Sequence, residues 1–153
     1  MNFRRATILD ARLLYDWRND PATRENSISR DRVDYETHLA WLEQSLADPA
    51  RRIFIVEDEA GVSVGTIRVD GRQDGGEGKV GAAELSWTVS PDCRGKGLGK
   101  AMLLGFVRLH DGAYTAQIKA RNLQSMKIAG HAGFAVARSE GGIIYLKRAR
   151  GGA

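Results

Sequence analysis

The chain has 153 residues, of which 42% are hydrophobic and 27% charged, and its formal net charge is +4 at pH 7. This size and balance predict one soluble domain, and no apolar run approaches the roughly 20 residues that a membrane-spanning helix needs. One cysteine, Cys93, allows no internal disulfide and no metal cluster, and the polar start of the chain has no secretory apolar stretch, so we expect a cytoplasmic protein. The positive charges are interleaved with acids, and no aromatic and basic stacking motif accompanies them, so nucleic acid is not the expected partner.

Hydrophobic periodicity predicts a strand and two helices in the first third of the chain. The strand lies around residues 3–6, and Thr7–Asp10 resembles a capping box. A helix follows whose apolar stripe should end near Asp20–Pro21, because proline disfavours helical geometry in the residue before it. A second helix is predicted over residues 31–47. The stripes consist of Leu9, Leu13, Leu14 and Trp17 in the first helix and Tyr35, Leu39, Leu42 and Leu46 in the second.

The rest of the chain reads as strands with two further helices. Strands are predicted at residues 52–56 and 62–69, joined by a hairpin, and at 83–89, after a glycine-rich stretch at 71–78 that we expect to be a mobile loop. A helix over 98–110 with Gly112 as its cap, a strand at 114–120, a helix at 123–132 and strands at 134–137 and 143–147 complete the pattern. We expect a single domain over 1–147 and a flexible basic tail over 148–153.

The most informative segment is the turn from Val89 to Lys100. Glycines at alternate positions let the backbone approach a ligand and turn its N–H groups outward, and the helix that begins near Leu98 adds unpaired first-turn amides. The segment lacks the Gly-Lys-Ser/Thr ending of a P-loop and the Gly-x-Gly-x-x-Gly spacing of a dinucleotide site. It therefore predicts a pyrophosphate cradle, against the alternative of a solvated glycine turn.

Two motifs resemble those of the GNAT superfamily of N-acetyltransferases. Arg94, Gly97 and Gly99 match its Arg-x-x-Gly-x-Gly acetyl-CoA signature, and Asn122–Phe134 is similar to its later motif, in which asparagine ends a strand and Gly-Phe closes a helix. The resemblance implies an α/β fold of order β-α-α-β-β-β-α-β-α-β-β, with a mostly antiparallel mixed sheet, splayed strands and helices on both faces.

The resemblance also implies acetyl-CoA as the acyl donor, no metal, and direct transfer to a primary amine. The backbone of Trp87 and Val89 would hold pantetheine, and Asn122 and Ser125 would contact the same arm. The amides that would hold the pyrophosphate are those of Arg94, Gly95, Lys96, Gly97, Leu98, Gly99 and Lys100. Direct transfer needs no protein nucleophile, and Cys93 is expected to be a spacer.

The catalytic candidates are Glu84 and Ser86, which strand parity places on one face of the predicted strand 83–89. Glu84 would act as the base, directly or through water, and the alternative is a salt-bridged structural residue. Many family members carry a tyrosine acid seven residues after the motif's asparagine, where this chain has Ala129. That departure keeps a non-catalytic acyl-CoA-binding module open.

The acceptor is suggested by the segment Trp17–Pro21 and by His38-x-x-Trp41, which resemble GNAT members that acetylate nucleotide-linked amino sugars. A looser form of the pattern occurs in relatives that modify ribosomal protein N-termini, so a protein or peptide N-terminus is the alternative acceptor. The expected substrate-binding residues are Arg18, Asn19, Arg24 and Ser27. The plainer alternative is core packing of the tryptophans and helix capping by Arg18 or Asn19. The sequence leaves a homodimer open.

Overall fold

A computed structural model describes residues 1–71 and 82–152. Within this part the backbone forms a seven-stranded sheet of order β1-β2-β3-β4-β5-β7-β6. Neighbouring strands are antiparallel except for the parallel pair β4 and β5. The strands are β1 (Asn2–Arg5), β2 (Arg51–Glu57), β3 (Ser63–Asp70), β4 (Ala83–Val89), β5 (Tyr114–Lys119), β6 (Ala135–Glu140) and β7 (Ile143–Arg148).

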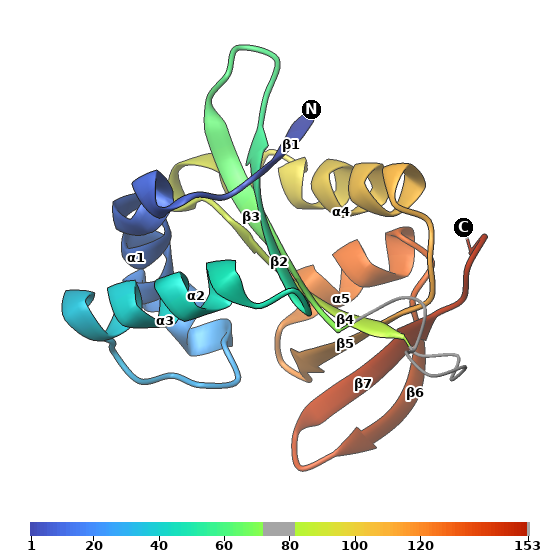
Figure 1. Ribbon diagram of the computed structural model, residues 1–153. Coiled ribbons are helices and arrows are strands. Elements are labelled where there is room, and N and C mark those ends of the chain that lie inside the picture. The colour runs from blue at the N-terminus through green and yellow to red at the C-terminus, as the bar shows by residue number, and fades with distance from the viewer. Residues whose placement is uncertain (72–81, 153) are drawn as a thin grey trace.

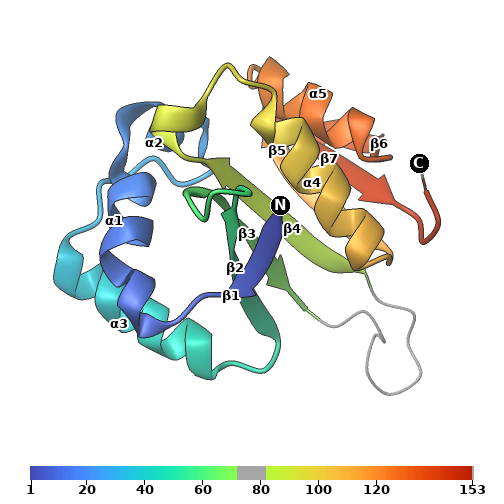
Figure 2. The same cartoon turned by 90° about the horizontal axis from the view of Figure 1, so that it is seen from above.

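Helices cover both faces of the sheet, with α1 and α3 on one side and α4 and α5 on the other (Figures 1 and 2). The helices are α1 (Ala11–Asn19), α2 (Pro21–Asn26), α3 (Tyr35–Ala47), α4 (Leu98–Leu109) and α5 (Leu123–His131). The short 3-10 turns η1 (Ile8–Asp10) and η2 (Pro91–Cys93) precede α1 and α4. This mixed, mostly antiparallel sheet between two helical layers confirms the predicted fold class.

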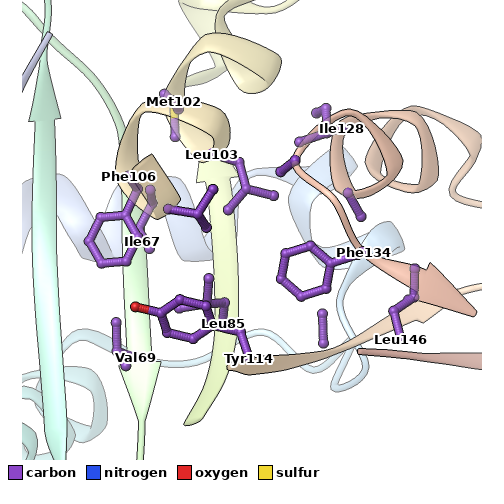
Figure 3. Close-up of a cluster of buried hydrophobic side chains, with 14 of the residues drawn as sticks. Ile67, Val69, Leu85, Met102, Leu103, Phe106, Tyr114, Ile128, Phe134 and Leu146 are labelled. Atoms are coloured by element: carbon purple, nitrogen blue, oxygen red, sulfur yellow. The ribbon is translucent and has the colours of Figure 1, made fainter. Parts of the chain in front are cut away.

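Each helical layer has its own hydrophobic core. Phe106 of α4 and Ile128 of α5 pack with β-strand residues such as Leu85 and Tyr114 in the larger core (Figure 3). Leu14 and Trp17 of α1 and Leu42 of α3 pack against β2 in the smaller core. Complete burial of one such side chain contributes about 1.5–3 kcal/mol, so both cores hold the central strands in place.

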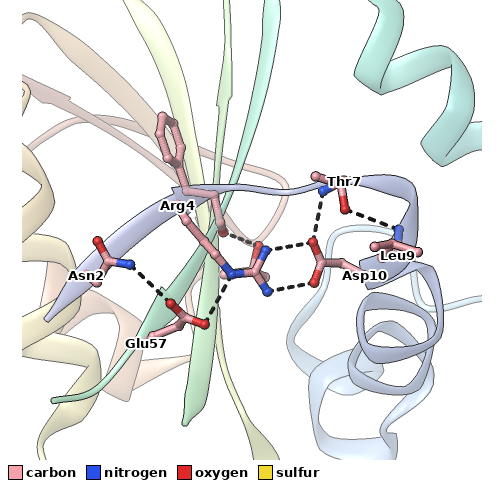
Figure 4. Close-up of polar contacts among 8 residues, drawn as sticks. Asn2, Arg4, Thr7, Leu9, Asp10 and Glu57 are labelled. Atoms are coloured by element: carbon pink, nitrogen blue, oxygen red, sulfur yellow. Dashed lines mark hydrogen bonds and ion pairs between the residues drawn. The ribbon is translucent and has the colours of Figure 1, made fainter. Parts of the chain in front are cut away.

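A polar cluster fixes the first turn of the chain to the sheet (Figure 4). The guanidinium of Arg4 donates to both oxygens of Asp10, at 2.9 and 2.7 Å, and to Glu57 at 3.1 Å. Thr7 and Asp10 form the predicted capping box. The hydrogen bonds from Arg4 lower the pKa of Asp10, although burial of the carboxylate opposes the shift.

The strands β4 and β5 separate soon after they meet. They pair only through Ala83 with Tyr114 and Glu84 with Thr115. Beyond Glu84 no residue of β5 pairs with residues 85–89, while β5 keeps its pairing with β7 over its whole length. The last five residues of β4 therefore have a free edge inside the sheet, as the predicted splayed strands require.

Most predicted elements are confirmed, but the first two helices differ from expectation. Leu9 is 91% exposed, because it lies in the η1 turn and not on the helix stripe. Pro21 begins the unpredicted helix α2: proline fits the first helical position, and the side chain of Asp20 accepts from the amide of Thr23 at 3.0 Å. Helix α3 begins at Tyr35, because Asp34 caps it through the amide of Thr37.

Two predictions near the end of the chain are wrong. Gly112 does not cap α4, because the helix ends at Leu109 and His110 is its C-cap residue. Arg148 belongs to β7 and is 4% exposed, so it is not part of a flexible tail. Its guanidinium donates to the carbonyl oxygens of Ala132 at 3.0 Å and Gly112 at 2.8 Å, which satisfy it inside the protein. The predicted loop at 71–78 lies, beyond Gly71, outside the described residues.

Candidate active site

The turn between β4 and α4 has the backbone geometry of an anion cradle. Gly97 caps α4 with φ 72° and ψ 10°, and Gly95 has φ 77°. Side chains are strained in this left-handed region, so glycine is required there although a Cβ would meet no neighbour. No described residue accepts a hydrogen bond from the amides of residues 94–100. These donors and the positive end of α4 are therefore free for a phosphate group.

Gly99 is needed for a different reason, namely the close approach of α4 to its neighbours. A Cβ built on Gly99 would overlap Cδ1 of Ile128 and would lie 3.3 Å from Cγ2 of Val89. The first turn of α4 is thus wedged between α5 and the end of β4. The cradle and the free edge of β4 consequently share one rigid corner.

The charged side chains of the cradle do not all point at one place. Arg94 donates to Oδ2 of Asp20 and to Oγ1 of Thr23, both at 2.7 Å. Its guanidinium therefore holds the N-terminus of α2, while its backbone amide stays in the cradle. Burial alone would raise the pKa of Asp20, but the hydrogen bonds from Arg94 and Thr23 outweigh it and lower that pKa. Lys96 and Lys100 are exposed and form no ion pair with a described residue.

A cavity of about 610 Å³ lies on the side of the sheet covered by α1 and α3. Ser86 and Thr88 line it from one face of β4, and Leu85 and Trp87 line it from the other. Because residues from both faces of β4 take part, the cavity continues into the opening between β4 and β5. The wall opposite consists of α1, α2, α3 and the segment 27–33.

The expected substrate-binding residues divide into two groups. Arg18 and Ser27 line the cavity. Asn19 does not, because its side-chain amide is occupied by the backbone of Val33, which it meets at 2.8 and 3.0 Å. Arg24 donates to the carbonyl oxygen of Arg30 at 3.1 Å. Asn19 and Arg24 thus shape the segment that closes the cavity, and neither of them lines it.

The two catalytic candidates also lie differently. Ser86 lines the cavity, whereas Glu84 does not. Glu84 lies at the closed end of the opening, where β4 still pairs with β5 and faces Asp70 of β3. It forms no ion pair with a described residue, so the salt-bridged alternative finds no support there. Among the described residues of the lining, no side chain is a carboxylate.

Asn122 and Ser125 line the cavity as expected. Oδ1 of Asn122 also accepts from the amide of Ser125 at 3.2 Å, so the asparagine caps α5. Ala129 is fully buried in the larger core, and His131 lies exposed at the end of the same helix. Neither of these two positions supplies an acid to the cavity.

Several residues of the cavity wall were not among the predicted substrate-binding residues, including His38, Thr66, Arg68 and Gln117. His38 is 5% exposed, and its Nδ1 is buried without a described partner. Burial, followed by the charge of Arg18, lowers the pKa of His38. The His-x-x-Trp pattern was the sequence feature that pointed to His38. Arg68 gave none, because it reaches the wall only through the β3–β4 register, which places it opposite Ser86.

Within residues 1–71 and 82–152, no group of three or more histidine, cysteine, aspartate or glutamate side chains could hold a metal ion. No helix in the same ranges is long and apolar enough to cross a membrane.

Comparison with known proteins agrees with this geometry. The family model described as an acetyltransferase (GNAT) domain matches residues 1–135, which include the cradle, the open strands and α5. The chain therefore belongs to the GNAT family of N-acetyltransferases. No curated protein sequence matches it significantly.

Solved structures share the fold at low sequence identity. The Vibrio cholerae spermidine N-acetyltransferase, in complex with CoA and spermine, superposes with a TM-score of 0.83 and 14% identity over 99% of this chain and 96% of that one. The aminoglycoside acetyltransferase AAC(6')-Ib, in complex with ribostamycin and coenzyme A, gives 0.80 and 21% over 98% and 93%. The same enzyme with acetyl-CoA gives 0.78 and 19% over 98% and 93%.

Proposed function

We propose that this protein transfers the acetyl group of acetyl-CoA to a primary amine held in the cavity, and that the amine belongs to a nucleotide-linked amino sugar. The observation that carries the first part is the free edge of β4, which runs from the amide cradle to the cavity. A donor bound along this edge presents its acyl group to an acceptor that enters from the other side.

The residues of the chain would divide the work as follows. The amides of residues 94–100 and the N-terminus of α4 hold the pyrophosphate. Backbone groups of Trp87 and Val89 extend along pantetheine, and a β4 amide would polarise the thioester carbonyl and stabilise the developing oxyanion. Asn122 and Ser125 flank the same arm. Holding the two reactants at near-attack distance supplies most of the rate gain, since direct transfer needs no covalent help from the protein.

Proton removal from the amine is assigned to Ser86 and Glu84 together. Ser86 lines the cavity and is within reach of an acceptor. Glu84 lies two residues earlier on the same face of β4, so it acts through a water or through Ser86 and not by direct contact. Because Ala129 is buried in the core, the CoA thiolate leaves without a proton from the position that is usually tyrosine.

The acceptor class is inferred from the cavity wall. Arg18 and Arg68 line it, and no described lining residue is acidic. Charge-assisted hydrogen bonds from guanidinium groups suit a diphosphate, whereas a polyamine or an aminoglycoside would meet like charge. A cytoplasmic location and a homodimer stay predictions of the sequence.

A second candidate function is a non-catalytic acyl-CoA-binding module, which the burial of Ala129 in place of an acid favours. This module would bind CoA but would release no thiol with any amine.

A thiol-release assay with acetyl-CoA separates these functions. The acceptor panel contains amino-sugar nucleotides, peptides with free N-termini, aminoglycosides and spermidine, and calorimetry measures CoA binding in parallel. We expect thiol release with the amino-sugar nucleotides, and a loss of about 10²-fold or more in Glu84→Gln. Glu59→Gln, in the exposed β2–β3 hairpin, is the matched control. CoA binding without thiol release would favour the module, release only with peptides would favour an N-terminal acetyltransferase, and no heat with CoA would overturn both readings.

A further inference from the structure

We propose that Arg18 and Arg68 form an oxyanion subsite in the cavity, which binds a phosphate or carboxylate group carried by the acceptor. The proposal rests on the proposed function and narrows its substrate class. Acceptors that carry only amines and hydroxyls would leave this subsite empty, and Arg18 and Arg68 are the side chains that distinguish them from anionic acceptors.

Arg18 has an unused hydrogen-bond donor at the cavity wall. Its Nη1 is buried and has no described partner, and its Nη2 makes one long bond of 3.3 Å to the carbonyl oxygen of Ser29. No described carboxylate forms an ion pair with it. Burial lowers the pKa of Arg18, and the nearby charges of Arg24 and Arg68 lower it further, with only Asp31 opposing them. A partly buried guanidinium without a counter-ion is costly, and a bound oxyanion would lower that cost.

Arg68 reaches the same cavity from β3. Its Nε donates to Asp70 at 2.9 Å, but that carboxylate also accepts from Arg51 at 2.6 Å. One carboxylate therefore serves two guanidinium groups, and a net positive charge remains. The Arg68 side chain is 37% exposed, and its guanidinium lies 5.8 Å from the ring centre of Trp41. This aromatic contact orients the group and leaves its charge available.

The lining offers nothing to neutralise these charges. Its titratable side chains, among the described residues, are Arg18, His38 and Arg68. Burial and the charge of Arg18 lower the pKa of His38, which favours its neutral form. A cationic acceptor group would thus be repelled by two guanidinium groups, whereas an oxyanion would balance their charge and accept their hydrogen bonds.

The register of the sheet determines how far the oxyanion subsite lies from the site of acetyl transfer. Arg68 is directly opposite Ser86, and facing side chains on neighbouring strands are about 5 Å apart at Cβ. The subsite is therefore one strand away from the free edge of β4, where the acyl group is held. The amine and the oxyanion of the acceptor must be separated by a short distance within one molecule.

The first test measures binding without acetyl transfer. The protein is saturated with CoA, so that the amide cradle is filled, and its melting temperature is followed as pyrophosphate, uridine diphosphate or acetate is added. We expect a rise with at least one of these probes in the wild type, a rise that is absent in Arg18→Met and in Arg68→Met. Arg108→Met, at an exposed position of α4, removes the same charge elsewhere and should keep the rise. No rise with any probe in the wild type, or a rise that survives both cavity variants, overturns the proposal.

The second test compares acceptors in matched pairs. Thiol release is measured for an amino sugar with and without its phosphate groups, and for an α-amino acid and its amide. The anionic member should have kcat/KM higher by about 10- to 100-fold, the effect of a charge-assisted hydrogen bond, and the preference should vanish in Arg18→Met. The pair that shows the preference identifies phosphate or carboxylate as the natural group. Equal rates within both pairs overturn the subsite but not acetyl transfer, whereas no release with any amine overturns the transfer and leaves the binding test to decide the subsite.

Discussion

Replacing Gly97 by alanine tests the cradle most directly. Gly97 has φ 72° and ψ 10°, and a Cβ there would touch no atom within 4 Å. The whole cost is therefore conformational, about 1–2 kcal/mol for a left-handed alanine. If the turn keeps its shape, this cost appears as lower stability. If it relaxes, the amides of residues 94–100 lose the arrangement proposed to bind the pyrophosphate, and CoA affinity falls by up to about 5- to 30-fold, since 1.4 kcal/mol corresponds to a factor of ten.

Calorimetry with CoA and thermal unfolding, measured on the same preparations, distinguish these outcomes. Gly130→Ala is the matched control: Gly130 lies within α5 without a positive φ, and its Cβ would also meet nothing. It should gain about 0.5–1 kcal/mol of stability from helix propensity and should bind CoA normally. A Gly97→Ala protein with the wild-type CoA affinity and the wild-type melting temperature would refute the assignment of a glycine-dependent cradle.

Three further predictions concern the side chains that hold the site and the ends of the chain. Arg94→Met should raise the KM for the acceptor about 5-fold and leave the Kd for CoA almost unchanged, because its guanidinium holds Asp20 and Thr23 at the start of α2, and Thr23 lines the cavity. Steady-state kinetics and calorimetry measure the two constants, and a large loss of CoA affinity would contradict this assignment. Because the pKa of Asp10 is lowered in the folded protein, Asp10 stabilises the fold fully above the ordinary aspartate pKa of about 3.9. This contribution is lost as the pH falls through the lower folded value. In denaturant titrations from pH 6 to pH 2, Asp10→Asn should therefore lose less unfolding free energy than the wild type. Arg148→Met should lower the unfolding free energy, measured with denaturant, by about 3 kcal/mol, because it leaves buried carbonyl groups without their donor. A decrease of less than about 0.5 kcal/mol would disprove a structural role for this residue.

The fold could be predicted well because the elements are locally encoded. The strand over residues 83–89 alternates its faces, and its bounds agree with β4. The errors fall where one residue type permits two structures. A proline at position 21 is compatible with the end of α1 and equally with the start of a second helix. The cap supplied by Asp20 is what starts α2 there. Arg148 looked like part of a basic tail because a lone charge gives no sign of the carbonyl groups that will surround it.

The site could be predicted only in its backbone part. The cradle depends on glycine spacing, which is visible in the sequence, and the structure gives Gly97 the expected geometry. The cavity wall depends instead on which side chains meet across strands and helices. Arg68 became visible only through its pairing with Ser86, and Asn19 turned out to hold Val33 by a contact over fourteen positions. Such contacts follow from tertiary packing and leave no local pattern.

The brief parallel contact between β4 and β5 has a consequence for motion. Only two residue pairs join these strands in the described part of the chain. The sheet therefore consists of two halves, β1–β4 and β5–β7, that are hydrogen-bonded to each other at one end only. The packing of α4 against α5 is the second contact between the halves. An extended ligand bound between the two halves would replace the missing hydrogen bonds between β4 and β5 and would reduce the motion of both halves. The amide protons of residues 85–89 that point to the free edge, and not to β3, should therefore exchange rapidly with solvent in the CoA-free enzyme and slowly in the CoA-bound one. Separation of the two halves of the sheet would then limit the rate at which CoA is released.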